Sequence, residues 1–85
     1  MSDERRRIVA AAVKIGDRVW IGERHAFIMR AIREEWPEAP RITQEMQGFV
    51  DQHGQFWNRF QSGAIAFTAG QTKTRIKTLL SEHLW

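Results

Sequence analysis

GFVDQHGQFWNR, at Gly48–Arg59, is the segment from which the second half of the fold can be predicted. Two short aromatic runs flank a polar turn at His53–Gly54, and runs of this kind around a glycine-containing turn are typical of a β-hairpin. The segment therefore predicts two short strands, over Gln47–Val50 and Gln55–Trp57. Its aromatic, amide and guanidinium side chains are also the groups that stack on a base and hold a phosphate.

A helix is expected directly after this hairpin. Asn58 is a good N-cap, and Gln61 three residues later gives the spacing of a capping box. We predict a helix over Arg59–Ala69 that stops at Gly70, a suitable C-cap. Its expected buried side chains are Phe60, Ala64 and Phe67.

The N-terminal half of the chain begins with a second hairpin pattern. Ile8–Ile15 and Arg18–Gly22 are apolar runs separated by Gly16–Asp17, and a Gly-X pair in this position favours a two-residue turn. The turn predicts three cross-strand pairs, which are Ile15 with Arg18, Val13 with Trp20 and Ala12 with Ile21.

Both faces of this first hairpin are apolar. Alternation along the strands gives one face with Val9, Ala11, Val13 and Trp20, and another with Ile8, Ala10, Ala12, Val19 and Ile21. The chain's own helices can cover one face. We therefore expect the other face to meet a second subunit, and the protein to be an obligate homo-oligomer.

The remaining segments complete a single α+β domain over residues 1–85. Apolar residues recur at helical spacing over Ala26–Trp36, and Pro37 ends this helix. Glu38–Gln47 is a loop, with or without one helical turn, and a polar, basic tail starts at Gln71. The predicted order is an N-terminal antiparallel β-hairpin, a helix, a short second β-hairpin, a helix and a C-terminal tail.

Composition limits the class of protein. The chain has 85 residues, no cysteine and a net charge of +3. A chain without cysteine has neither disulfides nor thiolate metal sites, which fits a reducing cytoplasm. No apolar run reaches the length of a membrane span, and the start lacks the apolar core of a signal peptide. The basic excess favours anionic partners such as nucleotides or nucleic acid.

The sequence does not indicate catalysis. His25, His53 and His83 fall in three different elements, and the chain has no cysteine nucleophile. No His/Asp cluster has metal-ligand spacing, and no glycine-rich loop precedes a helix with a Lys-Ser/Thr pair. We therefore expect a protein that is not an enzyme and has no metal or cofactor.

Three arginines are candidates for contact with an anion. Arg24 and His25 stand at a helix start, where free amides favour an anion. In the alternative, His25 donates to a backbone carbonyl and Arg24 is solvated. Arg59, one residue into a helix, is disfavoured by the helix dipole unless an anion or carboxylate offsets it. Arg75, in a Thr-Lys-Thr-Arg-Ile-Lys run, is either a solvated residue or a phosphate contact.

Two of the aromatic residues differ in their expected roles. Phe56 and Trp57 are neighbours on a strand, so their side chains point to opposite faces. One of them belongs to the core, and the other is free to stack on a base or on another subunit. The cap of the second helix is enough to explain Asn58.

Five short motifs follow one another along the chain. They are Gly22-Glu23-Arg24-His25, Gly48-Phe49, Gly54-Gln55-Phe56-Trp57-Asn58-Arg59, Ala69-Gly70-Gln71 and Leu79-Leu80-Ser81-Glu82-His83-Leu84-Trp85. Their order and spacing resemble those of a family of small phage and prophage proteins, the first-described Thoeris anti-defence proteins. His83 departs from the family pattern, which has an acidic residue there, and the loop before Gly48 is short.

The resemblance implies a sponge protein of the host bacterial cytoplasm. Such proteins bind and sequester cyclic ADP-ribose derivatives that bacterial immune systems use as signals. Some members also bind cyclic oligonucleotides at separate sites, and the proteins assemble as dimers or hexamers. By motif matching, the resemblance implies a signal pocket lined by Phe49, Phe56 and Asn58, with Arg24 and Arg75 on phosphates.

Two alternatives remain at the level of the sequence. The basic clusters Arg5–Arg7 and Lys73–Lys77 suit a module that binds nucleic acid or a host defence protein. The apolar hairpin suits a phage structural protein that only self-associates.

Overall fold

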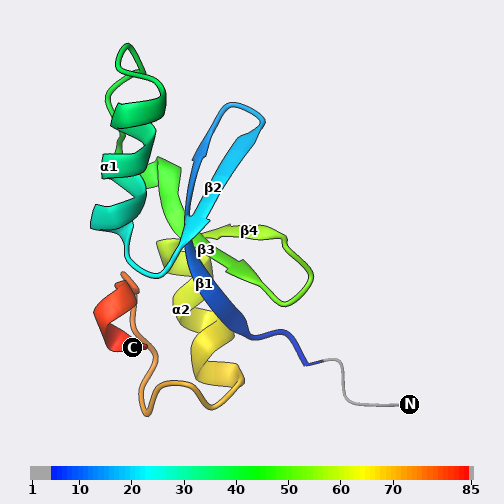
Figure 1. The fold of residues 1–85 in the computed structure, drawn as a ribbon. Helices are drawn as coiled ribbons and strands as arrows, with labels where there is room; N and C mark the ends of the chain where they lie inside the picture. Colours follow the sequence, from blue (N-terminus) through cyan, green and yellow to red (C-terminus); the bar gives the residue numbers. More distant parts are fainter. Residues whose placement is uncertain (1–4, 85) are drawn as a thin grey trace.

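Figure 1 shows the computed structural model of the chain, which describes residues 5–84 as one sheet and two α-helices. The elements are β1 (Ile8–Ile15), β2 (Arg18–Gly22), α1 (His25–Glu35), the short 3-10 helix η1 (Gln44–Met46), β3 (Gln47–Asp51), β4 (Phe56–Asn58), α2 (Arg59–Thr68) and the 3-10 helix η2 (Ser81–His83). The strands pair antiparallel in the order β2-β1-β3-β4. The predicted α+β fold and the order of its hairpins and helices are confirmed.

The β1–β2 hairpin has the register that its turn predicts. Ile15 pairs with Arg18 and Val13 pairs with Trp20. Gly16 has a φ of 62°, a left-handed conformation that such a turn needs and that glycine adopts without steric cost. The chemistry of the turn is therefore enough to set the pairing of these two strands.

The start of β1 differs from the prediction because the strand contains a bulge. The register against β3 shifts between Ile8 and Ala10, so Ile8 lies in the core at 2% exposure while Val9 is 46% exposed. The predicted faces of Ile8 and Val9 were wrong, since an extra residue reverses the alternation. The side chain of Gln71 holds the bulge. It donates to the Ile8 carbonyl at 2.7 Å and accepts from the Ile8 amide at 2.8 Å.

The hydrophobic core lies on one face of the sheet. Side chains of both α-helices and of the tail belong to this core, so both helices cover the same face. Helix α1 packs along β1 and β2, and α2 packs along β3 and β4 (Figure 1). The buried cluster contains Ile8, Ala11, Val13, Ile28, Ile32, Phe49, Ala66 and Leu79.

Helix α2 turns a different side to the core from the one predicted. Phe60 and Phe67 are 55% and 45% exposed, whereas Ser62, Gly63 and Ala66 are buried. These small residues let the tail come close, since a Cβ added to Gly63 would lie 1.8 Å from a carbonyl oxygen of the tail. The prediction failed because close backbone packing outweighs the aromatic pattern of the helix.

The opposite face of the sheet is partly covered by β4. Phe56 lies over Gly48, where an added Cβ would be 2.8 Å from the ring, and the Lys14 amine lies 5.9 Å from the ring centre. Val9 and Ile21 do not join the core and are exposed. A single chain therefore leaves apolar side chains of the first hairpin in solvent.

Candidate functional site

Arg59 has the environment expected of an anion-binding residue. It is the first residue of α2, and its side chain is half-buried. Its Nη2 donates to the side-chain oxygen of Gln47 at 2.8 Å, whereas its Nε is buried and has no hydrogen-bond partner. Within residues 5–84, no carboxylate forms an ion pair with it. Burial lowers the pKa of Arg59, because desolvation disfavours the charged guanidinium.

The surrounding chain fixes the position of Arg59. Asn58 accepts from the amide of Gln61 at 2.7 Å, and the Gln61 side chain accepts from the Asn58 amide at 3.1 Å. The predicted capping box is thus confirmed, and it sets where α2 begins. The amide of Leu79 donates to the Arg59 carbonyl at 3.3 Å, which ties the tail to the same turn of the helix.

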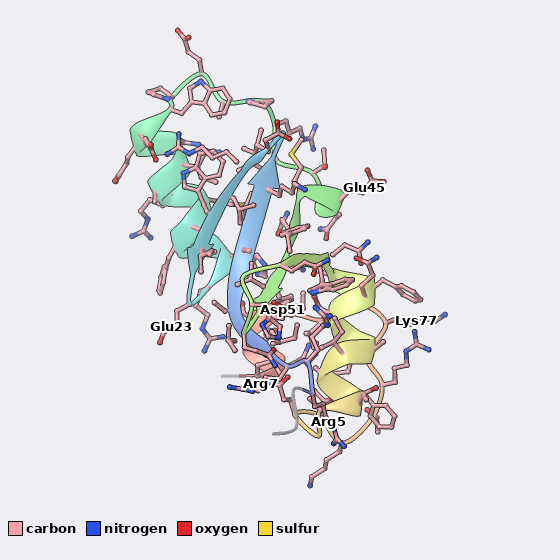
Figure 2. The ribbon with its side chains drawn as sticks, turned by 90° about the vertical axis from the view of Figure 1, so that its right-hand side faces the viewer. Arg5, Arg7, Glu23, Glu45, Asp51 and Lys77 are labelled. Atoms are coloured by element: carbon pink, nitrogen blue, oxygen red, sulfur yellow. The ribbon has the colours of Figure 1, made fainter. Side chains whose placement is uncertain are left out.

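A groove of about 620 Å³ lies beside the start of α2, and we call it the α2 groove. Phe60 and Leu80 give it apolar surface, while Arg59 and Lys77 give it positive charge. Figure 2 shows Glu45 and Lys77 extending from the side of the molecule that carries α2. The lining residues are Gln44, Glu45, Asn58, Arg59, Phe60, Lys77, Thr78 and Leu80.

A smaller cavity of about 220 Å³ lies between the starts of the two helices, and we call it the junction cavity. Arg24 lines it from the position just before α1, His25 from α1, Arg59 from α2, and Ser81 and Glu82 from η2. The first amides of an α-helix have no partners within the helix and carry partial positive charge. Arg59 belongs to both cavities, so positive charge is continuous between them.

His25 is a buried, neutral part of this site. Its Nε2 donates to the carbonyl of Gly48 at 2.7 Å, and its Nδ1 accepts from the Ser81 hydroxyl at 3.5 Å. Burial lowers the pKa of His25, and the nearby charge of Arg59 lowers it further, against the hydrogen bond to Gly48. The alternative expected for this residue, donation to a backbone carbonyl, is confirmed.

The structure brings four of the seven predicted site residues together. Arg24 and His25 line the junction cavity, Asn58 lines the α2 groove, and Arg59 lines both. Arg75 does not line either cavity. Its guanidinium lies 5.2 Å from the centre of the Phe60 ring, so it supports a ring that lines the α2 groove.

Phe49 and Phe56 line neither cavity. Phe49 is 0% exposed and packs edge-to-face on His25, with ring centres 5.0 Å apart. It therefore supports the site from within the core. Phe56 pairs with Val50 at the start of β4 and covers Gly48 on the other face of the sheet.

Sequence reasoning missed the apolar side of the α2 groove. It assigns Phe60 to the core, places Lys77 only in the basic cluster Lys73–Lys77 and gives Leu80 no place in a site, yet all three line the groove. One signal was present for Phe60. Gly63 and Ala66 form a face of small residues on the same helix, and such a face permits a close approach of another segment. The tail residues carried no local signal, because their position depends on contacts with distant segments.

A second polar cluster, around Asp51, is structural. Its carboxylate accepts hydrogen bonds from Arg6 at 2.5 Å and Trp57 at 2.9 Å, and from the amides of His53 and Gln55 at 2.8 and 3.0 Å. Burial alone would raise the pKa of Asp51, but these hydrogen bonds outweigh it and hold the pKa well below its usual range. Arg6 is engaged in this cluster and stacks on Trp57.

Two general features complete the description of residues 5–84. No group of three or more His, Asp or Glu side chains is placed there to hold a metal ion. No helix in this part of the chain has the length and apolar character needed to cross a membrane.

These observations define a small α+β protein with a positively charged site between the starts of its two helices. A family model described as Phage T4 y16D protein matches residues 7–85, and the chain belongs to this family. The match supports the broader expectation, a phage protein. No curated protein and no solved structure matches the chain.

Proposed function

We propose that this protein is a phage immune-evasion protein that binds and sequesters cyclic nucleotide signals, such as cyclic ADP-ribose derivatives or cyclic oligonucleotides, without degrading them. The observation that carries the proposal is the state of Arg59. A partly desolvated guanidinium without a carboxylate, and with an unpartnered Nε, is unfavourable in the empty protein. A phosphate would supply the missing acceptor and the missing negative charge.

The two cavities suit a ligand that carries a base and more than one phosphate. Arg24 and Arg59 flank the junction cavity, and Lys77 adds a third cation along the α2 groove. The exposed ring of Phe60 offers a stacking surface in the same groove. A volume of about 620 Å³ falls in the range of small-molecule sites, about 300–1,000 Å³. The groove is open to solvent, so a second copy of the chain is expected to cover the ligand.

Sequestration rather than turnover is supported by the chemistry at the site. Ser81 is a nucleophile beside a base, since its hydroxyl contacts His25 at 3.5 Å. That contact is long, and the lowered pKa of His25 makes it a weak base. We therefore expect a bound nucleotide to be recovered unchanged.

The test is a thermal and calorimetric titration with cyclic ADP-ribose isomers and cyclic dinucleotides. At a ligand concentration one hundred times Kd, a binding signal should stabilise the fold by about 2.7 kcal/mol. Arg59→Gln should remove this stabilisation, because it removes the cation that both cavities share. Arg30→Gln, on the exposed side of α1, is the matched control and should bind as the unchanged protein does.

The released ligand should have its original mass by mass spectrometry. The proposal is wrong if no member of the panel stabilises the protein, or if Arg59→Gln binds as tightly as the unchanged chain. Recovery of a cleaved nucleotide would mean that the protein is an enzyme instead.

Nucleic-acid binding is a second candidate because Lys73, Arg75 and Lys77 are all exposed on the tail. The other basic cluster is weakened for this purpose, since Arg6 is engaged by Asp51. Nucleic-acid affinity would fall steeply with salt, in proportion to the phosphates neutralised. A gel-shift series in increasing salt separates this outcome from the binding of a small nucleotide.

A further inference from the structure

Glu45 is an acidic residue in the wall of an otherwise basic groove. It lines the α2 groove together with Arg59 and Lys77, and it forms no ion pair with either of them. It carries no hydrogen bond within the described chain, so its carboxylate is available to a ligand. In Figure 2 it extends on the same side of the molecule as Lys77. A site for a plain polyanion would not need this group, because a carboxylate repels phosphates.

The frame around Glu45 fixes it relative to Arg59. Met46, the next residue of η1, packs against the core. Gln47 is buried, and its side chain donates to the Thr43 carbonyl at 3.4 Å while accepting from Arg59 at 2.8 Å. The side chain of Gln47 therefore connects the segment that carries Glu45 to the guanidinium of Arg59. The backbone that carries Glu45 is thus held beside the guanidinium of Arg59, and both residues line the same groove.

The groove therefore offers three kinds of contact. The Phe60 ring can stack on a flat ring system, and Arg75 supports it from outside the groove. Arg59 and Lys77 attract phosphates. The carboxylate of Glu45 accepts hydrogen bonds only, so it requires donors on the ligand. A nucleotide meets all three requirements when its base has donors on the edge that faces Glu45.

The bases differ strongly in this respect. Guanine has a ring N–H and an amino group side by side, and both can donate to the two oxygens of one carboxylate. Adenine has an amino group next to a ring acceptor, so it can donate to only one oxygen of the carboxylate. Uracil has a single N–H between two carbonyl oxygens, and these would face a carboxylate unfavourably.

We propose that Glu45 makes the α2 groove selective for nucleotides that contain guanine. This inference rests on the proposed function and names the class of signal that the same site prefers. The stacked base lies on Phe60 with its donor edge toward Glu45, and its phosphates extend toward Arg59 and Lys77.

The experiment compares the 3′,5′-cyclic dinucleotides of guanosine, adenosine and uridine, which share one charged backbone. Titration calorimetry should show that the guanosine compound binds about tenfold or more tighter than the uridine compound, the discrimination typical of a bidentate base contact. Glu45→Gln should reduce this ratio to about twofold or less, because an amide donates as well as accepts. Glu34→Gln, an exposed acid on α1, is the matched control and should keep the full ratio.

The outcomes separate the two proposals. If all three compounds bind equally, and Glu45→Gln changes nothing, the inference about Glu45 is wrong while nucleotide binding stands. If the unchanged protein prefers the uridine compound, the inference is also overturned. If none of the three compounds nor any cyclic ADP-ribose isomer binds, the proposed function fails and this inference fails with it. An unchanged protein without a preference for guanine overturns the inference even if a variant folds poorly, and a preference that persists in Glu45→Gln overturns it as well.

Discussion

The carboxylate of Asp51 accepts four hydrogen bonds inside the second hairpin, and its side chain is fully buried. Two of these bonds come from the backbone of its own turn, and two come from the side chains of Arg6 and Trp57. The residue therefore joins the turn, a tryptophan of β4 and the segment before β1. A buried charge with a complete set of partners is stabilising only while all of them are present.

Asp51→Asn should lower the free energy of unfolding at pH 7 by about 3 kcal/mol, because it leaves the Arg6 charge and several donors poorly paired. The folded-state pKa of Asp51 is depressed, so its contribution is fully present above the ordinary carboxyl pKa of about 3.9 and is lost as the pH falls through the lower folded-state value. Urea unfolding from pH 7 down into acid should therefore show the two proteins converging at low pH.

Asp17→Asn is the matched control for this comparison, since Asp17 is an exposed turn residue. It should change the unfolding free energy little at any pH. An Asp51→Asn protein as stable as the unchanged chain at pH 7 would show that the cluster does not stabilise the fold.

Single residues also show what the sequence could reveal about the site. Arg59 could be selected because a cation at a helix start opposes the helix dipole. Arg24 could be selected as a site residue because a helix starts directly after it, and the free amides of a helix start favour an anion. Phe49 could not be distinguished from a ligand-binding aromatic, because its burial depends on pairing between β1 and β3 and on the position of His25. Phe60 was misassigned for a related reason, since its exposure depends on where the tail packs.

Among the elements, the contact between α2 and the tail forms one wall of the site. Gly63 leaves room for the tail backbone, and the amide of Leu79 bonds to the carbonyl of Arg59. The tail residues Lys77 and Leu80 then line the α2 groove. Displacing this part of the tail from α2 would therefore open the groove.

Gly63→Ala should displace this wall, because a Cβ would lie 1.8 Å from the carbonyl oxygen of Ile76. We expect a loss of about 1–3 kcal/mol in the free energy of unfolding, the usual cost of overpacking. The Leu79 amide should exchange faster in hydrogen-exchange measurements, and nucleotide affinity should fall. Thr68→Ala, an exposed change on the same helix, should have neither effect. Unchanged protection of Leu79 would contradict this account of the wall.

The elements differ in how well the sequence predicts them, and the difference follows the range of the contacts. The β1–β2 register and the start of α2 were predicted, because Gly16–Asp17 and the Asn58–Gln61 capping box act locally. The bulge at Ile8 was not predicted, because it is held by the side chain of Gln71, which is distant in the sequence. Strand β4 begins and ends one residue later than predicted, a difference within ordinary boundary scatter.

At the scale of the whole molecule, the surface of the first hairpin bears on assembly. Both helices cover one face of the sheet, and Val9 and Ile21 are exposed away from that core. Exposed apolar side chains on a sheet favour association with another copy. We therefore expect copies of the protein to associate through this surface.

The double substitution Val9→Lys and Ile21→Lys should convert the assembly to monomers, because it places charges where apolar side chains would meet. Native mass spectrometry and sedimentation velocity measure the change directly. Phe27→Lys, on the exposed side of α1, is the control and should leave the assembly intact. A monomeric unchanged protein would contradict the expectation, as would a double variant that still assembles.

The unpartnered Nε of Arg59 has a consequence for anyone who engineers this protein. A long apolar side chain at position 59 would remove a desolvated charge from the empty fold, so screening for heat resistance alone would favour it. The variants with the highest thermal stability in such a screen should then have the lowest affinity for the ligand. Selection schemes for this scaffold should therefore apply ligand and temperature together.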